Sequence, residues 1–186
     1  MLQPGDAAPD FSLTGVRNGE KEEFHLSEAT NAGNYVVLFF YPADFSPVCT
    51  PEMCAIRDSE FFEFTPNVLP WGVSGDTSYA HKAFAAEYGL NFPLLSDTDR
   101  SVAELYNVRY EEWEGHRSIP KRGVFLVDPQ QRLRYVWTNE DAYVAPDLWP
   151  LKEALDEAIA TGELETGAST DSLEPDYDKY DIEQLD

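Results

Sequence analysis

Basic residues are scarce in this sequence. Lysine and arginine together number 13 against 35 aspartates and glutamates, so the formal net charge of the 186 residues is −22 at pH 7. Nucleic acids and anionic membrane surfaces attract proteins mainly through cationic side chains. The charge therefore argues against a nucleic-acid partner and against a membrane partner.

The sequence also lacks a long apolar segment. Its longest apolar run, residues 35–41, is much shorter than the roughly 20 residues that a helix needs to cross a bilayer. The first six residues have neither the basic segment nor the apolar segment of a secretory signal peptide. From these features we expect a protein of the cytoplasm.

Cysteine is rare, with only Cys49 and Cys54 in the chain. Stable structural disulfides are uncommon in the cytosol, so the pair is expected to be catalytic, metal-binding or inert. A zinc site would need further ligands from His25, His81 and His116, which are scattered and share no motif. Each histidine is therefore expected at the surface or at a helix cap.

The excess of acidic residues predicts strong self-repulsion in dilute salt. At an ionic strength of about 1 M the Debye length falls to about 3 Å, and most of that repulsion is screened. We therefore hypothesise a halophilic, salt-rich cytoplasm as the native setting, with an ordinary acidic protein as the alternative. Equal melting temperatures at low and at multimolar KCl would exclude the first interpretation.

The predicted elements alternate strands with helices and end with two strands in succession. Strands are expected over residues 35–41, 68–74, 91–97, 123–128 and 132–138. Helices are expected over residues 48–64, 77–88, 99–106 and 148–160, and one short hairpin within residues 4–34. The order predicts one α/β domain, in which a mixed central sheet carries helices on both faces.

The composition changes at Gly162. The last 25 residues hold nine acidic residues, one lysine and few apolar side chains. Such a segment buries too little apolar surface to offset the entropy lost on ordering. We predict a folded domain over residues 1–161 and a disordered acidic tail over residues 162–186.

Residues 41–54 connect the end of a buried strand to the start of a helix, where α/β sheets bind ligands. Because proline is tolerated only in the first helical turn, Pro51 predicts a helix that begins at about Val48. Cys49 then lies in the first turn. There the unpaired backbone N–H groups and the helix dipole favour a thiolate, the nucleophilic form of cysteine.

Cys49 and Cys54 cannot form a disulfide within an intact helix. Residues five apart in a helix have Cα atoms roughly 8–9 Å apart and point about 140° away from each other. A disulfide needs Cα atoms within about 7 Å. If the two cysteines bond, at least the first turns of the helix must unwind.

This segment resembles the peroxiredoxin signature Pro-x-x-x-(Thr/Ser)-x-x-Cys, with Pro42, Ser46 and Cys49 at the three fixed positions. The Cys-Thr-x-Glu-x-Cys pattern that ends at Cys54 is similar to the bacterioferritin-comigratory-protein, or PrxQ-like, subfamily of the AhpC/TSA superfamily. Residues 5–13, 72–76, 92–97 and 122–128 also resemble family segments. The resemblance covers roughly residues 4–160 and implies a thioredoxin-like fold.

The resemblance also implies a role for each site residue. Arg122 stabilises the Cys49 thiolate and binds the peroxide oxygens, a task suited to a permanently charged guanidinium. Ser46, which replaces the commoner threonine, binds peroxide through its hydroxyl, and Pro42 shields the thiolate. Glu52 orients Arg122.

The implied activity is the reduction of hydrogen peroxide and organic hydroperoxides, in antioxidant defence and redox homeostasis. Cys49 becomes a sulfenic acid, Cys54 condenses with it to a disulfide, and a thioredoxin-like dithiol reduces that disulfide. No cofactor is expected, and the protein is expected to be a monomer or a homodimer.

Several alternatives stay open from the sequence. Cys54 can be a packing residue, in which case a thiol from another molecule would react with the oxidised Cys49. Cys49 can also be an inert buried cysteine. The domain can serve as a binding or chaperone module. A general thiol–disulfide oxidoreductase usually needs a Cys-x-x-Cys pair, which is absent. An Arg122 far from the sulfur, or a sulfur sealed in the apolar interior, would contradict the peroxidase mechanism.

Overall fold

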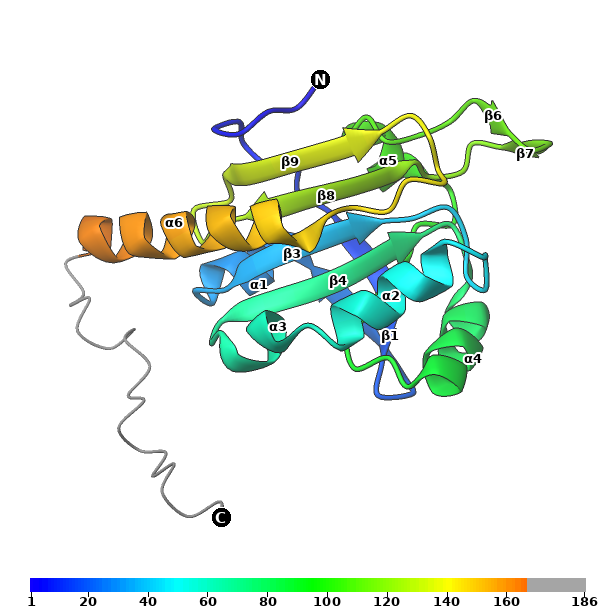
Figure 1. The fold of residues 1–186 in the computed structure, drawn as a ribbon, viewed down its shortest axis with the longest axis horizontal. Coiled ribbons are helices and arrows are strands. Elements are labelled where there is room, and N and C mark those ends of the chain that lie inside the picture. Colours follow the sequence, from blue (N-terminus) through cyan, green and yellow to red (C-terminus); the bar gives the residue numbers. More distant parts are fainter. Residues whose placement is uncertain (167–186) are drawn as a thin grey trace, which may run out of the picture.

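A computed structural model describes residues 1–166, which form a sheet with helices on both faces (Figure 1). The sheet has seven strands in the order β2-β1-β5-β4-β3-β8-β9. Its strands are β1 (Ser12–Arg17), β2 (Glu20–His25), β3 (Tyr35–Phe40), β4 (Val68–Ser74), β5 (Leu94–Ser96), β8 (Arg122–Val127) and β9 (Leu133–Asn139). Because β3 runs parallel to β4 and antiparallel to β8, the prediction of a mixed sheet is confirmed.

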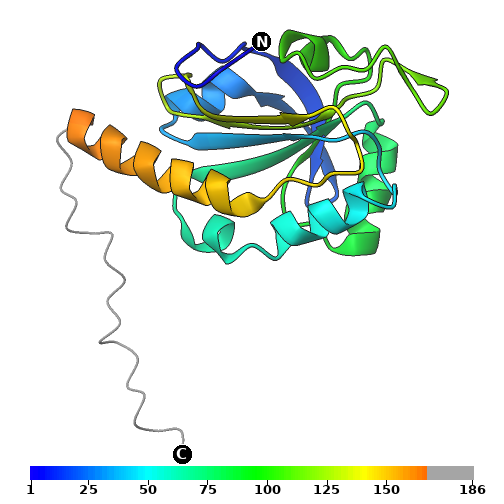
Figure 2. The ribbon, with the colours of Figure 1, turned by 45° about the horizontal axis from the view of Figure 1, so that its top comes forward.

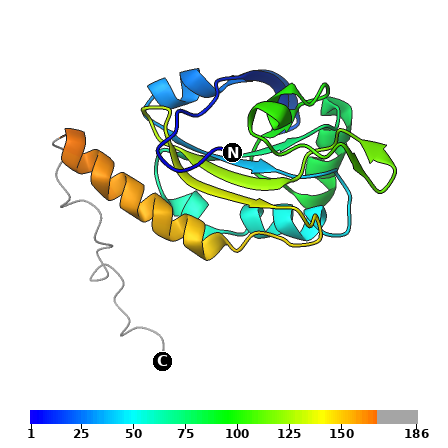
Figure 3. The ribbon, with the colours of Figure 1, turned by 90° about the horizontal axis from the view of Figure 1, so that it is seen from above.

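The helices cover both faces of the sheet, as predicted. They are α1 (Leu26–Asn31), α2 (Cys49–Arg57), α3 (Glu60–Phe64), α4 (Ser78–Tyr88), α5 (Ser101–Leu105) and α6 (Leu148–Thr166). Figures 2 and 3 show α1 and α5 on one face, and α2, α3 and α6 on the other. Each face has its own apolar core; α4 contributes Phe84 to the core beneath α2 and α6.

β3 is the central strand that places the site. Residues 36–40 are completely buried, because helices cover both faces and neighbouring strands cover both edges. A run of β-branched and aromatic residues with no polar side of its own suits such a position. The strand ends at Phe40, one residue earlier than predicted, and the chain then passes through residues 41–48 into α2.

The predicted single helix over residues 48–64 was wrong. α2 ends at Arg57, Ser59 has an extended backbone, and α3 starts at Glu60. The Ser59 hydroxyl donates a hydrogen bond of 2.7 Å to the carbonyl of Ala55, a local bond that competes with helix continuation. The break lets the Phe62 ring pack edge-on against Phe39, with their centroids 5.9 Å apart.

The predicted helix end at Gly162 was also wrong, because α6 continues to Thr166. A Cβ atom at Gly162 would lie 2.7 Å from the Tyr35 hydroxyl oxygen. Glycine is needed there for the close approach of that hydroxyl, which donates to the carbonyl of Ala158 at 3.1 Å. Most of the predicted acidic tail, residues 167–186, lies outside the described residues.

The amino-terminal hairpin was predicted, whereas two other elements were missed. β1 and β2 pair through a two-residue turn in which Asn18 and Gly19 both have positive φ. The sequence shows no hydrophobic periodicity at two short elements, which were therefore not predicted. These are the helix α1 and the small hairpin of β6 (Glu112–Trp113) and β7 (His116–Arg117). Within residues 1–166, no helix combines the length and apolar character that crossing a bilayer requires.

Candidate active site

The register of the sheet brings Arg122 to the segment that carries Cys49. β3 and β8 are antiparallel, with Phe40 opposite Gly123. Arg122, the first residue of β8, therefore lies at the carboxyl end of β3, where residues 41–48 begin. Cys49 and Arg122, which are 73 positions apart in the sequence, meet at this edge of the sheet.

Cys49 is the first residue of α2, in agreement with the position predicted from Pro51. Its backbone N–H donates to the Ser46 hydroxyl oxygen at 3.1 Å, and the Thr50 N–H donates to the Ser46 carbonyl at 3.1 Å. Ser46 thus accepts hydrogen bonds from two of the first N–H groups of the helix. The Ser46 hydroxyl hydrogen remains available to donate to another acceptor.

Arg122 is held by three contacts and is 1% exposed. Its Nη2 donates to Cys49 Sγ at 3.2 Å, and its Nε donates to the Ala142 carbonyl at 2.5 Å. Its Nη1 forms a buried ion pair with the Glu52 carboxylate. The guanidinium therefore has little freedom to turn away from the sulfur.

Glu52 is buried one helical turn after Cys49. Burial raises the pKa of the Glu52 carboxyl to about 7, although the nearby Arg122 charge pulls that pKa downward. Burial thus makes the Glu52 carboxylate a weaker counterion, so the Arg122 charge can also stabilise an anion at Cys49.

A cavity of about 430 Å³ lies next to this cluster. Part of its wall comes from the segment before α2 and from β8, namely Pro42, Ser46, Val48 and Arg122. Other lining residues come from the β6–β7 hairpin, the segment that follows it and the loop after β9, namely Trp113, Ile119, Ala142 and Tyr143. Cys49 itself is completely buried and is not part of the wall.

Sequence reasoning missed these other lining residues. The Trp113 ring packs against Tyr143, with centroids 5.8 Å apart, and stacks on Tyr110 at 6.1 Å. No pattern in the sequence around Trp113 distinguishes a residue that lines a cavity from one that only packs against its neighbours. Ala142 acts through its backbone carbonyl, for which the side chain gives no signal.

The predicted site residues Pro42, Ser46, Cys49, Glu52 and Arg122 all come together at the cavity or directly beneath it. Cys54 is half-buried on α2, away from the residues that line the cavity. Both cysteines are free, and α2 is helical over the whole interval between them.

The expectation that every histidine is a surface or capping residue was wrong for His81, which is completely buried. Its two ring nitrogens contact Asp44 and the Leu95 carbonyl, and these partners make burial possible. His116 is exposed, and His25 precedes α1 at the capping position. Among the described residues, no group of three or more His, Cys, Asp or Glu side chains is arranged to hold a metal ion.

The sequence is similar to known proteins over most of its length. The AhpC/TSA family model matches residues 4–136. The putative peroxiredoxin ycf42 of Porphyra purpurea is 38% identical over 147 residues, which are 74% of this chain and 69% of that protein. Peroxiredoxin-2 of Bos taurus is 38% identical over 164 residues, 83% of this chain and 74% of that protein.

Solved structures share the fold. Enterococcus faecalis AhpC matches with a TM-score of 0.75 and 25% identity, over 91% of this chain and 99% of that one. The peroxidoxin BcpB of Mycobacterium tuberculosis matches with a TM-score of 0.67 and 28% identity, over 87% of this chain and 96% of that one. The predicted thioredoxin-like fold is confirmed. This chain therefore belongs to the AhpC/TSA family and is a peroxiredoxin, a thiol-dependent peroxidase.

Proposed function

We propose that the peroxidase reaction of this protein proceeds through a sulfenic acid on Cys49. The Cys49 thiolate attacks the terminal oxygen of a hydroperoxide, and the O–O bond breaks as the S–O bond forms. The leaving hydroxide or alkoxide takes up a proton and departs as water or an alcohol. Cys49 is oxidised by two electrons, and the peroxide is reduced by the same two.

The contact of 3.2 Å between Arg122 Nη2 and Cys49 Sγ is the observation that carries the proposal. A guanidinium stays protonated throughout the physiological range, so it stabilises an anionic sulfur next to it. The same group borders the cavity, where it can also donate to the peroxide oxygens. Ser46 borders the cavity as well, and its hydroxyl has a hydrogen to donate.

Access to the sulfur needs a small movement, because Cys49 has no exposed surface. The sulfur is nevertheless not enclosed by apolar groups alone, since it accepts a hydrogen bond from a charged side chain at the cavity wall. The proposal therefore requires that part of residues 41–48 shift by a small amount when a hydroperoxide enters.

Cys54 is proposed to resolve the sulfenic acid by forming a disulfide with Cys49. The intact α2 keeps the two residues too far apart for that bond, so its first turns must unwind. α2 has only nine residues, so few helical hydrogen bonds oppose this unwinding, and the bond from the Cys49 N–H to the Ser46 hydroxyl must also break. A thioredoxin-like dithiol then reduces the disulfide by thiol exchange.

The substrates proposed are hydrogen peroxide and organic hydroperoxides. A cavity of about 430 Å³ is much larger than hydrogen peroxide, and Trp113, Ile119 and Tyr143 give it apolar surface for an alkyl group. Antioxidant defence and redox homeostasis in a cytoplasm remain the proposed setting. A monomer or a homodimer remains the prediction for the assembly.

Stopped-flow mixing with one equivalent of hydrogen peroxide tests the proposal. The wild-type protein should lose thiol rapidly with a change in tryptophan fluorescence, whereas Cys49→Ser should react no faster than free cysteine. Cys54→Ser is the matched control on the same helix, because it should keep the first reaction and fail only in recycling by thioredoxin. Rapid peroxide consumption by Cys49→Ser would refute the assignment of the nucleophile.

Mass spectrometry of the intact protein distinguishes the two routes after the first step. Loss of two hydrogens after stoichiometric peroxide would indicate a Cys49–Cys54 disulfide. Gain of one oxygen would instead indicate a sulfenic acid that waits for an external thiol, which would refute the role of Cys54.

A further inference from the structure

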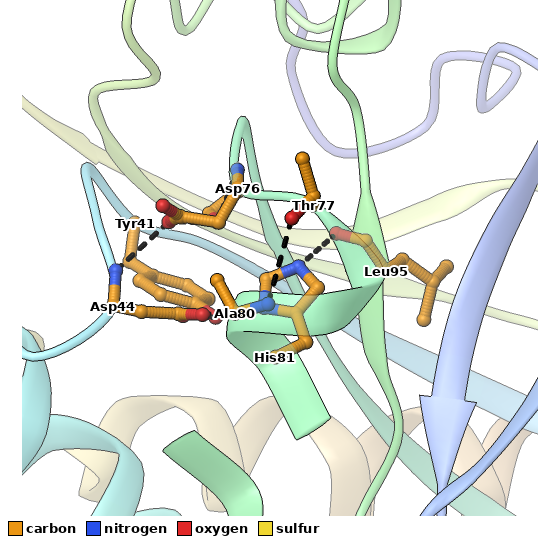
Figure 4. Close-up of polar contacts among 8 residues, drawn as sticks. Tyr41, Asp44, Asp76, Thr77, Ala80, His81 and Leu95 are labelled. Atoms are coloured by element: carbon orange, nitrogen blue, oxygen red, sulfur yellow. Dashed lines mark hydrogen bonds and ion pairs between the residues drawn. The ribbon is translucent and has the colours of Figure 1, made fainter. Parts of the chain in front are cut away.

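A second buried polar cluster joins Tyr41 and Asp44, from the segment before α2, to Asp76 and to His81 of α4 (Figure 4). His81 of α4 places Nδ1 2.8 Å from Asp44 Oδ2 and Nε2 3.1 Å from the Leu95 carbonyl oxygen. Asp44 Oδ1 accepts a hydrogen bond of 2.7 Å from the Tyr41 hydroxyl. The Asp44 backbone N–H donates to Asp76 Oδ2 at 2.8 Å. The His81 and Asp44 side chains are both buried.

The hydrogen bonds of His81 determine how many protons the pair holds. A carbonyl oxygen can only accept, so Nε2 of His81 must carry a proton to bond Leu95. A neutral imidazole would then turn the lone pair of Nδ1 toward a carboxylate oxygen 2.8 Å away. Two lone pairs repel at that distance, so one further proton must lie between His81 and Asp44.

The groups around the pair indicate that the proton belongs to the imidazole. The Tyr41 hydroxyl donates to Asp44, which stabilises the carboxylate form, and burial and the charge of Asp44 raise the pKa of Tyr41 well above its usual value. Asp76, which also accepts from the Ser74 hydroxyl at 2.8 Å, adds a second negative charge nearby. Both negative charges favour an imidazolium at His81.

The contact between His81 and Asp44 is one of several that hold residues 41–48 against α4. Phe45, the next residue, has a φ of +61°, a backbone conformation that most side chains avoid. Its ring packs on Phe84 of α4, with centroids 5.0 Å apart. Asp44 lies midway between Pro42 and Ser46, so this anchor fixes the stretch of chain that carries both residues to the cavity.

We propose that His81 is a positioning residue for the reaction of Cys49 with hydroperoxide, acting as an imidazolium that ties Asp44 to the Leu95 carbonyl. The inference rests on the proposed function. Loss of the proton removes the bond to Asp44, loosens residues 41–48 and displaces Pro42 and Ser46 from the cavity wall. The rate of peroxide reduction then falls when the pair loses this proton.

NMR of protein labelled with ¹⁵N in its histidines tests the protonation state without reference to activity. In the wild-type protein at neutral pH, both ring nitrogens of His81 should carry a proton. The spectrum of His81→Gln identifies the signals. An unprotonated Nδ1 at neutral pH would overturn the proposal.

Asp44→Asn tests the consequence for the reaction. Its amide oxygen can accept from Tyr41, and its amide N–H can donate to an unprotonated Nδ1, so the anchor forms without the extra proton. The wild-type rate constant with hydrogen peroxide should fall at alkaline pH, and that fall should disappear in Asp44→Asn. The same alkaline fall in both proteins would overturn the proposal.

His81→Phe removes the anchor but keeps a ring of similar size. The rate constant should drop by roughly 10- to 100-fold, the range caused by displacing catalytic groups by about 1 Å. Tyr79→Ala, on the exposed part of the same helix, is the control that should leave the rate unchanged. A faster His81→Phe would overturn the proposal, because the anchor would then obstruct access. A wild-type protein without peroxidase activity would refute the proposed function and leave the NMR result intact.

Discussion

Two buried clusters of charged groups adjoin residues 41–48, and they differ in their cation. The first, the arginine cluster, consists of Cys49, Glu52 and Arg122. The second, the histidine cluster, consists of Tyr41, Asp44 and His81. Arginine keeps its charge at every physiological pH, whereas histidine changes its charge near neutrality. The first cluster is therefore suited to hold a reactive anion, and the second to make the surrounding chain sensitive to pH.

The largest effect should follow from weakening the arginine cluster with Arg122→Lys. A single ammonium cannot contact Cys49 Sγ, Glu52 and the Ala142 carbonyl at once, so the rate constant with hydrogen peroxide should fall by roughly 100-fold or more. Stopped-flow fluorescence measures this rate. Arg109→Lys, at a partly exposed arginine paired with Glu104, is the matched control. An unchanged rate in Arg122→Lys would contradict the role of the guanidinium.

Glu52→Gln should reveal how much folding stability the protein loses when the buried Glu52 carboxyl ionises. Burial raises the Glu52 pKa from 4.5 to about 7, so the folded state binds the proton more tightly than the unfolded state. Relative to Glu52→Gln, the wild-type protein should lose up to about 3 kcal/mol of stability as the pH rises from about 4.5 through about 7. Urea unfolding at a series of pH values measures the difference. A difference that grows in the opposite direction would contradict this assignment.

Tyr41→Phe should weaken the histidine cluster by a smaller amount. The substitution removes the hydroxyl that donates to Asp44, and the free energy of unfolding should fall by about 1–2 kcal/mol. Denaturant unfolding measures the loss. Tyr79→Phe removes an exposed hydroxyl from a residue that is 83% exposed, and it should have no measurable effect. Equal losses in the two variants would show that the buried hydroxyl contributes nothing specific.

Salt should have the smallest effect on either cluster, because both are buried. Multimolar KCl should raise the melting temperature by screening the repulsion of a chain with a net charge of −22. The ratio of the wild-type rate to the Arg122→Lys rate should stay the same at low and high salt. A melting temperature that does not depend on KCl would exclude the halophilic interpretation.

Much of the site was predictable because its signals are local. Pro51 limits where α2 can begin, and that limit puts Cys49 in the first turn. The apolar residues of β3 indicate a central strand, and its end marks the place of a ligand site. The assignment of Arg122 to the site came only from the resemblance to a family, because nothing local in the sequence relates it to Cys49.

The sequence by itself determined the strand, the turn and the helix that present Cys49, since backbone preferences of proline and of β-branched residues act over a few positions. Only the tertiary structure decided which cation meets the sulfur, why His81 is buried, and which side chains enclose the cavity. Those outcomes depend on strand register and on packing between segments far apart in the chain, such as β3 with β8 and α4 with residues 41–48. The free energy of such contacts depends on the whole fold, so no short stretch of sequence contains it.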